Sequence, residues 1–282
     1  MITCYDDIIL NRANGGADDP FWFKTSAVGG VTGAWYGFMR RAGVPGVWAP
    51  ALATAGGSIM NVNSVGAIPV VTPAAGKTKI LVGQGISSST SVLGVMMLCD
   101  VLWAGSGIDA TNTGVQTINS PALTRSTNGI GNMILLFCSA ALGATASNIT
   151  IVYVDDTTTQ RSVTFAMTPS LTVDRLQMNP AGIAAFIQLD PASKGVKSIV
   201  SVQFSANMTA GTLDIMIVDP MTVFPTIASN AWVEKDATMN IDGIIPIPMD
   251  TSNVPGYLTY FTFTNSTTTG TVKGQLKMVH EV

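Results

Sequence analysis

Apolar runs separated by glycine and turn residues dominate the pattern along this chain. The main group lies in the stretch from Leu93 to Asp155, with apolar runs at 93–99 and 133–142 and a strand-like run at 149–154. A short apolar run bounded by turn residues is typical of a strand buried on both faces, although a buried helix shares the pattern. We take this stretch as the centre of the predicted fold.

Alternation of apolar and polar residues is clearest in the second half of the chain. It runs through 200–205, 213–218, 261–264 and 272–278. Alternation of this kind predicts half-buried antiparallel strands with one face toward solvent. Further strands are expected at 79–86, 160–167 and 184–189, and a hairpin turn at 265–270. The recurring short strands predict an all-β fold, an antiparallel β-sandwich.

The first 65 residues follow a different pattern and predict an N-terminal arm with short helices. One helix is expected from Tyr5 to Arg12, behind an acidic start. A second is expected over 33–41, where Trp35, Phe38 and Met39 have helical spacing. The arm, 1–65, is expected to pack on its own β body or on a neighbouring subunit. The body spans 66–282, with a weaker boundary near 169.

Composition changes the picture, because this chain has few charges for its size. Charged residues make up 11% of its 282 residues, against about 25% in an ordinary soluble domain. Apolar residues make up 47%. A free monomer would have to expose much of this apolar surface, and large exposed apolar patches mark interaction sites. We therefore expect an assembly. The net charge of −3 argues against nucleic-acid binding, which usually requires a basic patch.

Targeting and redox signals suggest synthesis in a cytoplasm. Acidic residues at 6–7 stand where a secretory signal has basic ones, so no signal peptide is expected. The apolar run at 133–146 is too short for a bilayer span, and no membrane partner is expected. Cys4, Cys99 and Cys138 are odd in number and far apart, which fits reduced, mostly buried thiols.

Candidate chemistry is sparse, and we expect neither an enzyme nor a cofactor. The only histidine, His280, is expected to be structural at a strand end, so both a catalytic triad and a conventional zinc site lack their residues. Gly76-Lys77-Thr78 resembles the end of a P-loop, but the first motif glycine is replaced by Val71. Asp155-Asp156 is read as a solvated turn rather than a calcium site. A pair of carboxylates for glycoside hydrolysis stays open as an alternative.

Two segments resemble structural proteins of tailed bacteriophages. They run from Leu98 to Ile108 and from Thr117 to Arg125. The N-terminal segments at 21–24 and 33–46 are similar too, so the resemblance covers about the first 165 residues. The chain departs from the pattern at Cys99, Val101, Ala104 and Thr124, and it matches the pattern at Asp100, Leu102, Trp103, Pro121, Ala122, Leu123 and Arg125.

The resemblance implies a virion protein that decorates or cements the capsid, commonly as a homotrimer with a jelly-roll-like body. Its partners would be the major capsid protein and its own copies, and its location the capsid surface after synthesis in the host cytoplasm. A tail, baseplate or host-adhesion location is the alternative, and a virion-borne polysaccharide hydrolase is a more distant one. The family offers no catalytic residues to carry over.

Aromatic residues are the candidates for contact with the capsid or with sister subunits. Aromatic side chains dominate both interfaces and cores, so packing within the same chain is the competing interpretation for each one. The candidate interface residues are Phe21, Trp22, Phe23, Trp35, Trp48, Leu102 and Trp103.

Overall fold

The computed structural model confirms an all-β fold. It describes residues 2, 5–25, 32–48, 56–89, 94–178, 185–226, 231–236, 245–264 and 270–282. Within these residues the chain has one α-helix, α1 (Tyr5–Asn11), followed by a π-helical turn at Arg12–Gly16, and seventeen strands. The strand pairs are antiparallel, and the sheets form a sandwich-like arrangement, as the sequence predicts.

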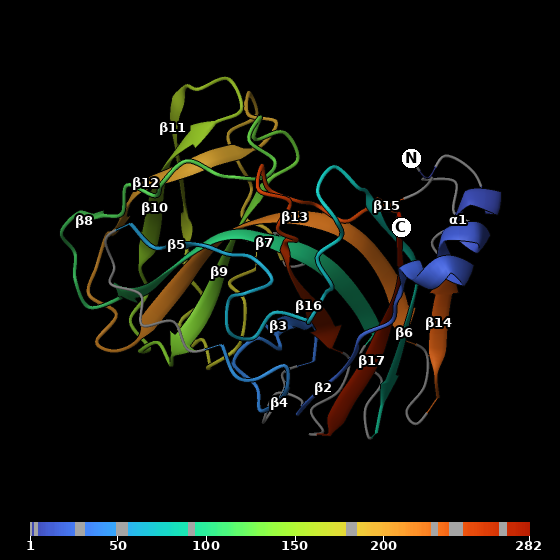
Figure 1. Ribbon diagram of the computed structural model, residues 1–282. Coiled ribbons are helices and arrows are strands. Elements are labelled where there is room, and N and C mark those ends of the chain that lie inside the picture. The colour runs from blue at the N-terminus through green and yellow to red at the C-terminus, as the bar shows by residue number, and fades with distance from the viewer. Residues whose placement is uncertain are drawn as a thin grey trace.

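A central sheet of six strands crosses the middle of the molecule (Figure 1). Its order is β3-β16-β7-β13-β9, and β5 pairs with β7. The strands are β3 (Ala34–Gly37), β5 (Ser58–Ile59), β7 (Gly94–Asp109), β9 (Met133–Ala140), β13 (Thr212–Thr226) and β16 (Tyr257–Thr264). The two longest, β7 and β13, pair from Asp109–Thr212 at one end to Gly94–Thr226 at the other.

A β-bulge in β7 changes which side chains face each side of the central sheet. Trp103 pairs with Ile217 and Val101 pairs with Val218, so Leu102 is an extra residue between them. A bulge of this kind interrupts the period-2 alternation of a strand. Leu102 and Trp103 therefore lie in one apolar cluster although they are adjacent in sequence. The predicted strand buried on both faces is confirmed over the described residues, while Leu93 lies outside them.

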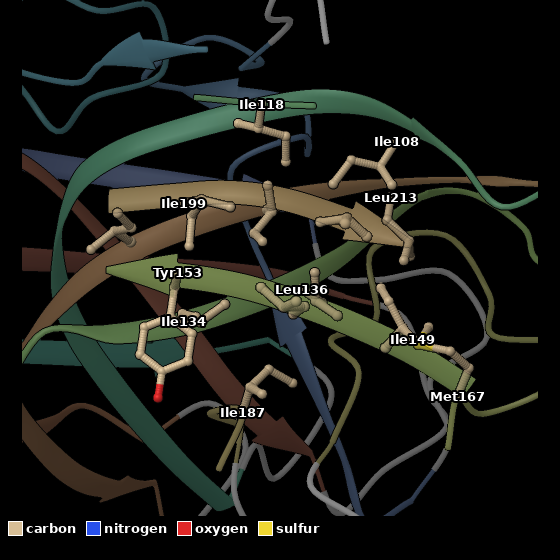
Figure 2. Close-up of a cluster of buried hydrophobic side chains, with 14 of the residues drawn as sticks. Ile108, Ile118, Ile134, Leu136, Ile149, Tyr153, Met167, Ile187, Ile199 and Leu213 are labelled. Carbon is tan, nitrogen blue, oxygen red and sulfur yellow. The ribbon is translucent and has the colours of Figure 1, made fainter. Parts of the chain in front are cut away.

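A small sheet of four strands covers one half of the central sheet. Its order is β11-β10-β12-β8. Figure 2 shows part of the apolar cluster between the two sheets, with Ile149 and Tyr153 from β10 and Ile134 and Leu136 from β9. The strands are β8 (Gln116–Thr117), β10 (Asn148–Asp155), β11 (Gln160–Ala166) and β12 (Val196–Phe204).

An outer sheet of seven strands covers the other half of the central sheet. Its order is β14-β6-β17-β2-β4, with β1 on β17 and β15 on β6. Trp22 from β2 stacks on Tyr260 from β16 at 4.9 Å between ring centroids, which joins the two sheets. On the opposite face, Ile8 of α1 packs with Ile80 and Val279. The strands are β1 (Ala17–Asp18), β2 (Phe21–Thr25), β4 (Gly43–Val44), β6 (Lys79–Ser88), β14 (Val233–Asp236), β15 (Ile245–Pro246) and β17 (Thr271–His280).

The predicted helix over 33–41 is wrong. Ala34–Gly37 forms β3, which pairs with β16 along the edge of the central sheet. Its four residues are all buried, so they contribute to the sheet and its core rather than to one amphipathic face. Trp35, Phe38 and Met39 all pack into apolar clusters, but they do so from a strand and from the turn that follows it. Their spacing therefore matches that of a buried helix face although no helix forms. Tertiary pairing overrides a short local pattern here.

Other sequence predictions have mixed outcomes. The strands expected at 79–86, 149–154 and 160–167 are confirmed with small shifts in their ends. The prediction of a strand at 184–189 is wrong, because residues 185–189 form no strand. This segment lies beside β9, and Ile187 N donates a hydrogen bond to Ile134 O. The helix over 5–12 is confirmed as α1. Residues 265–269 of the predicted turn, and Cys4, lie outside the described residues.

The described part of the N-terminal region packs on its own β body. β2 extends the outer sheet beside β17, and β3 extends the central sheet beside β16. Packing of this region on a neighbouring subunit stays a prediction. The boundaries near 65 and 169 stay predictions.

Candidate functional site: an exposed aromatic face and a buried ion pair

The outer face of β2 exposes two large aromatic side chains. Side chains alternate along this strand, so Trp22 and Lys24 point into the sandwich while Phe21 and Phe23 point outward. Phe21 is 63% exposed and Phe23 is 46% exposed. Such exposure on a sheet face is unfavourable in water unless another surface covers it.

Two further side chains extend this exposed surface across the outer sheet. Val44 of β4 pairs with Phe23 and is 48% exposed. The ring of Trp232 lies over Gly85 of β6, and its centroid is 6.5 Å from that of Phe21. Gly85 makes this possible, because a Cβ there would lie 2.4 Å from the indole. We call Phe21, Phe23, Val44 and Trp232 the aromatic face.

Charge around the aromatic face is low and mostly paired. Lys277 forms an ion pair with Glu234 at one side. Lys273 is exposed and pairs with Phe23 across β17 and β2, so it adds one positive charge beside the rings. An apolar centre with a thin polar rim resembles the composition of the core of a protein–protein interface.

The other predicted interface residues are buried in their own chain. Trp22, Trp35 and Trp48 are 3%, 8% and 3% exposed, and Leu102 and Trp103 are 1% and 0% exposed. Trp103 also donates its indole N–H to Gly56 O at 2.9 Å, which satisfies its one polar group. Packing within the chain therefore accounts for these five residues, and only Phe21 and Phe23 remain available for another surface. Sequence reasoning missed Val44 and Trp232, which join them only through strand pairing.

An Asp–Arg pair lies fully buried at the centre of the molecule. Arg125 Nε donates to Asp100 Oδ2 at 2.8 Å, and Nη2 donates to Oδ1 at 2.9 Å. Nη2 also donates to the carbonyl oxygen of Met60 at 2.6 Å. Asp100 is 0% exposed and Arg125 is 3% exposed. The guanidinium therefore ties the loop after β8 to β7 and to the segment before it. Both residues belong to the segments that carry the bacteriophage resemblance.

The surroundings of this pair favour a structural role. Burial raises the pKa of Asp100 to about 6, while its bonds from Arg125 oppose that rise. Asp219 is the strand partner of Asp100, accepts a bond from Ser126, and has a pKa raised by burial. Burial also raises the pKa of the neighbouring Cys99 thiol. A thiol that stays protonated and enclosed is a poor nucleophile.

A second ion pair lies where the outer sheet meets its flanking loops. Asp18 bonds the ammonium of Lys79 and accepts the N–H of Val71 at 2.8 Å. Lys79 also donates to Val71 O at 2.6 Å. His280 ends β17 as the strand partner of Lys79, and burial lowers its pKa. These contacts hold a loop to the sheet edge.

Among the residues that the structure describes, no group of three or more His, Cys, Asp or Glu could hold a metal ion. No helix in the described part of the chain is long and apolar enough to cross a membrane.

Comparisons with known proteins give no family. No protein-family model matches the sequence, and no curated protein matches it. Among solved structures, the chain is similar to infectious bursal virus derived T=1 particles, at 13% identity and a TM-score of 0.20, over 93% of this chain and 77% of that one. The infectious bursal disease virus VP2 subviral particle gives 13% identity and a TM-score of 0.18, over 93% and 80% of the two chains. TM-scores this low do not establish a shared fold.

Proposed function

We propose that this chain is a non-enzymatic structural protein of a tailed-bacteriophage virion, which decorates or cements the capsid surface. It would bind the major capsid protein and copies of itself, commonly as a homotrimer. The observation that carries the proposal is the aromatic face, a largely uncharged surface with four half-exposed side chains. Covering each of them would contribute about 1 kcal/mol, since burying a whole aromatic or aliphatic side chain contributes about 1.5–3 kcal/mol.

The buried ion pair supports the bacteriophage resemblance from a separate direction. The resemblance matches Asp100 in one segment and Arg125 in another, 25 positions apart, and the two side chains form a bidentate pair in the interior. Matching residues in the two segments thus belong to one structural unit. The low charge of the chain, at 11%, also suits a protein that is largely covered in a lattice.

A capsid-binding assay tests the proposal. Virions that lack this protein would be mixed with the purified chain, sedimented, and imaged by cryo-electron microscopy. We expect density on the capsid shell and saturable binding, with the protein among the most abundant in the wild-type particle. Density confined to the tail would contradict capsid decoration, and release of reducing ends from host polysaccharide would contradict the non-enzymatic assignment.

Matched variants test the role of the aromatic face. We expect Phe21→Ser combined with Trp232→Ser to weaken capsid binding at least tenfold, because two half-exposed rings are lost from the interface. Val115→Ser is the control, since Val115 is 61% exposed and lies outside the aromatic face. Equal binding by both proteins would exclude this face as the docking surface.

A further inference from the structure

Strand β11 leaves one edge of the small sheet unpaired. β11 pairs only with β10 among the strands of the described residues. Bonds from Met167 N to Ser147 O and from Asp155 N to Thr159 O mark hydrogen-bonded pairs at the two ends of this hairpin. Because such pairs alternate along an antiparallel ladder, the odd-numbered residues 161, 163 and 165 bond to β10. The backbone N–H and C=O groups of Ser162 and Thr164 therefore point away from β10, toward the open edge.

Other sheet edges in the described part of the chain are covered, charged or short, since the edge strands β4 and β8 have only two residues each. Residues 174–177 run along β9, with Cys138 N bonded to Arg175 O and Gln177 N bonded to Leu136 O. The edge strand β14 carries Glu234 and Lys235, and charged edge residues discourage strand addition. β11 is seven residues long, and no described segment pairs with its open edge. Its single charged residue, Arg161, is held by Asp155 at 3.0 Å.

A groove runs along this open edge. Its volume is about 340 Å³, and one wall consists of consecutive β11 residues from Ser162 to Phe165. The opposite wall is the segment from Ile187 to Pro191, which is held in place by bonds from Ile187 N to Ile134 O and from Asp190 N to the Tyr153 hydroxyl. Figure 2 shows Ile187 at the margin of the apolar cluster, on the side of Tyr153. The groove thus has a strand edge on one side and a fixed backbone on the other.

The groove lining selects against charged ligands. Val163, Phe165, Ile187 and Leu189 supply apolar surface, and Ser162 and Thr164 supply neutral polar surface. The single carboxylate in the lining, Asp190, accepts a bond from Ala192 N and lies 4.0 Å from the Arg161 guanidinium. An ion placed in the groove would find no unpaired partner of opposite charge among these residues. A neutral chain with a free backbone edge fits both features.

We propose that this groove binds an extended, uncharged segment of a partner polypeptide, which adds as a fifth strand beside β11. Ser162 and Thr164 exchange backbone hydrogen bonds with the segment, and every second side chain of it packs toward Phe165 and Ile187. The hairpin is prepared for this role, because Asp155 accepts bonds from Thr157 N and Thr159 N and the Thr150 and Thr164 hydroxyls bond at 2.8 Å. Strand addition of this kind draws its affinity from main-chain bonds. The inference does not depend on the virion assignment.

The test uses the full chain and a peptide with fluorescein in place of an N-terminal acetyl group, fluoresceinyl-Thr-Val-Ser-Val-Thr-amide, followed by fluorescence anisotropy. We expect saturable binding to the wild type. Thr164→Pro removes one edge N–H, and proline is tolerated on an edge strand. We expect it to raise the Kd about tenfold, because the free energy of one net hydrogen bond corresponds to a change of about that size. Thr164→Ala keeps the N–H and is the matched control, with binding expected within twofold of the wild type.

Two N-methylated peptides keep the test independent of how the variants fold. In one peptide, N-methyl groups replace the amide hydrogens that face β11 and so block those hydrogen bonds. In the other peptide, the N-methyl groups are on the alternate amides, which point away from β11. We expect one peptide to lose binding to the wild-type protein and the other to retain it. Equal binding by both, or absence of binding by the unmodified peptide, would overturn the proposal. Dimers in sedimentation that Thr164→Pro converts to monomers would also overturn it, since the occupant would then be a second copy.

Discussion

Replacing Arg125 with Met removes the positive partner of a buried carboxylate while keeping most of the side-chain volume. Arg125 makes two bonds to Asp100 and donates to the carbonyl oxygens of Met60 and Val101 at 2.6 and 3.2 Å. All four acceptors would lose this donor in the interior. Removing one partner of a buried ion pair costs about 3–5 kcal/mol. Because domains are stable by only about 5–15 kcal/mol, we expect Arg125→Met to remove about a fifth or more of the free energy of unfolding.

Urea denaturation at pH 7.5, followed by tryptophan fluorescence, measures this loss. A double-mutant cycle with Asp100→Asn separates the pair from the other contacts of Arg125. Since Asn leaves no buried charge behind, we expect the double variant to be more stable than the sum of the two single effects by about 2 kcal/mol or more. A loss below about 1 kcal/mol for Arg125→Met, or additive effects, would refute the reasoning.

The pH dependence of stability gives a second measurement on the same carboxylate. The folded pKa of Asp100, about 6, lies above its ordinary value of 3.8, so the folded state binds the proton more tightly. Its contribution to stability is fully present below pH 3.8 and is lost as the pH rises through about 6. We expect Asp100→Asn to remove this part of the slope, and an unchanged slope between pH 4 and 7 would contradict the assignment.

Three further substitutions test local features. Gly57→Ala should cost about 1–3 kcal/mol in thermal denaturation, because its Cβ would lie 2.4 Å from the Trp103 indole. Gly56→Ala is the control and should cost less, because both glycines have positive φ, +84° and +53°, but only Gly57 lacks space for a Cβ. Lys24→Met should remove a pH dependence of stability, because burial lowers the pKa of Lys24 to about 8, so the wild type should gain stability relative to the variant as the pH rises from 8 to 10.5. Asp155→Ala should destabilise the protein at pH 7, and the difference should fade as the pH falls from 3.8 to about 2, because hydrogen bonds hold the pKa of Asp155 at about 2. A pH-independent difference for either charged residue would contradict its assignment.

The strands could be predicted from the sequence where the pattern itself carries the structure. Alternation at 200–205 and 272–278 follows directly from one buried and one exposed sheet face, so β12 and β17 were predictable. The run at 93–103 was predictable as a strand only because its neighbours alternate. The bulge at Leu102 was not, since it depends on the register of a partner more than a hundred positions away.

The candidate site was predictable only in part, because it is assembled by pairing between distant segments. Phe21 and Phe23 were predicted interface residues, but the sequence grouped Trp22 with them, and only the pairing of β2 separates the two exposed rings from the buried Trp22. The sequence does not indicate which face is covered, and it gives no sign that Trp232 joins them. The side chains of Asp100 and Arg125 also meet through a fold that no local pattern specifies.

The shared pair β7 and β13 has a mechanical consequence for a molecule with two packed halves. One end of this pair lies in the apolar cluster with the small sheet, and the other lies in the cluster with the outer sheet. The two halves therefore have no hinge between them, because two continuous strands cross the junction side by side (Figure 1). A load applied along these strands would shear many cross-strand hydrogen bonds together rather than open them one at a time. The molecule should therefore transmit tension from one half to the other as a single stiff body.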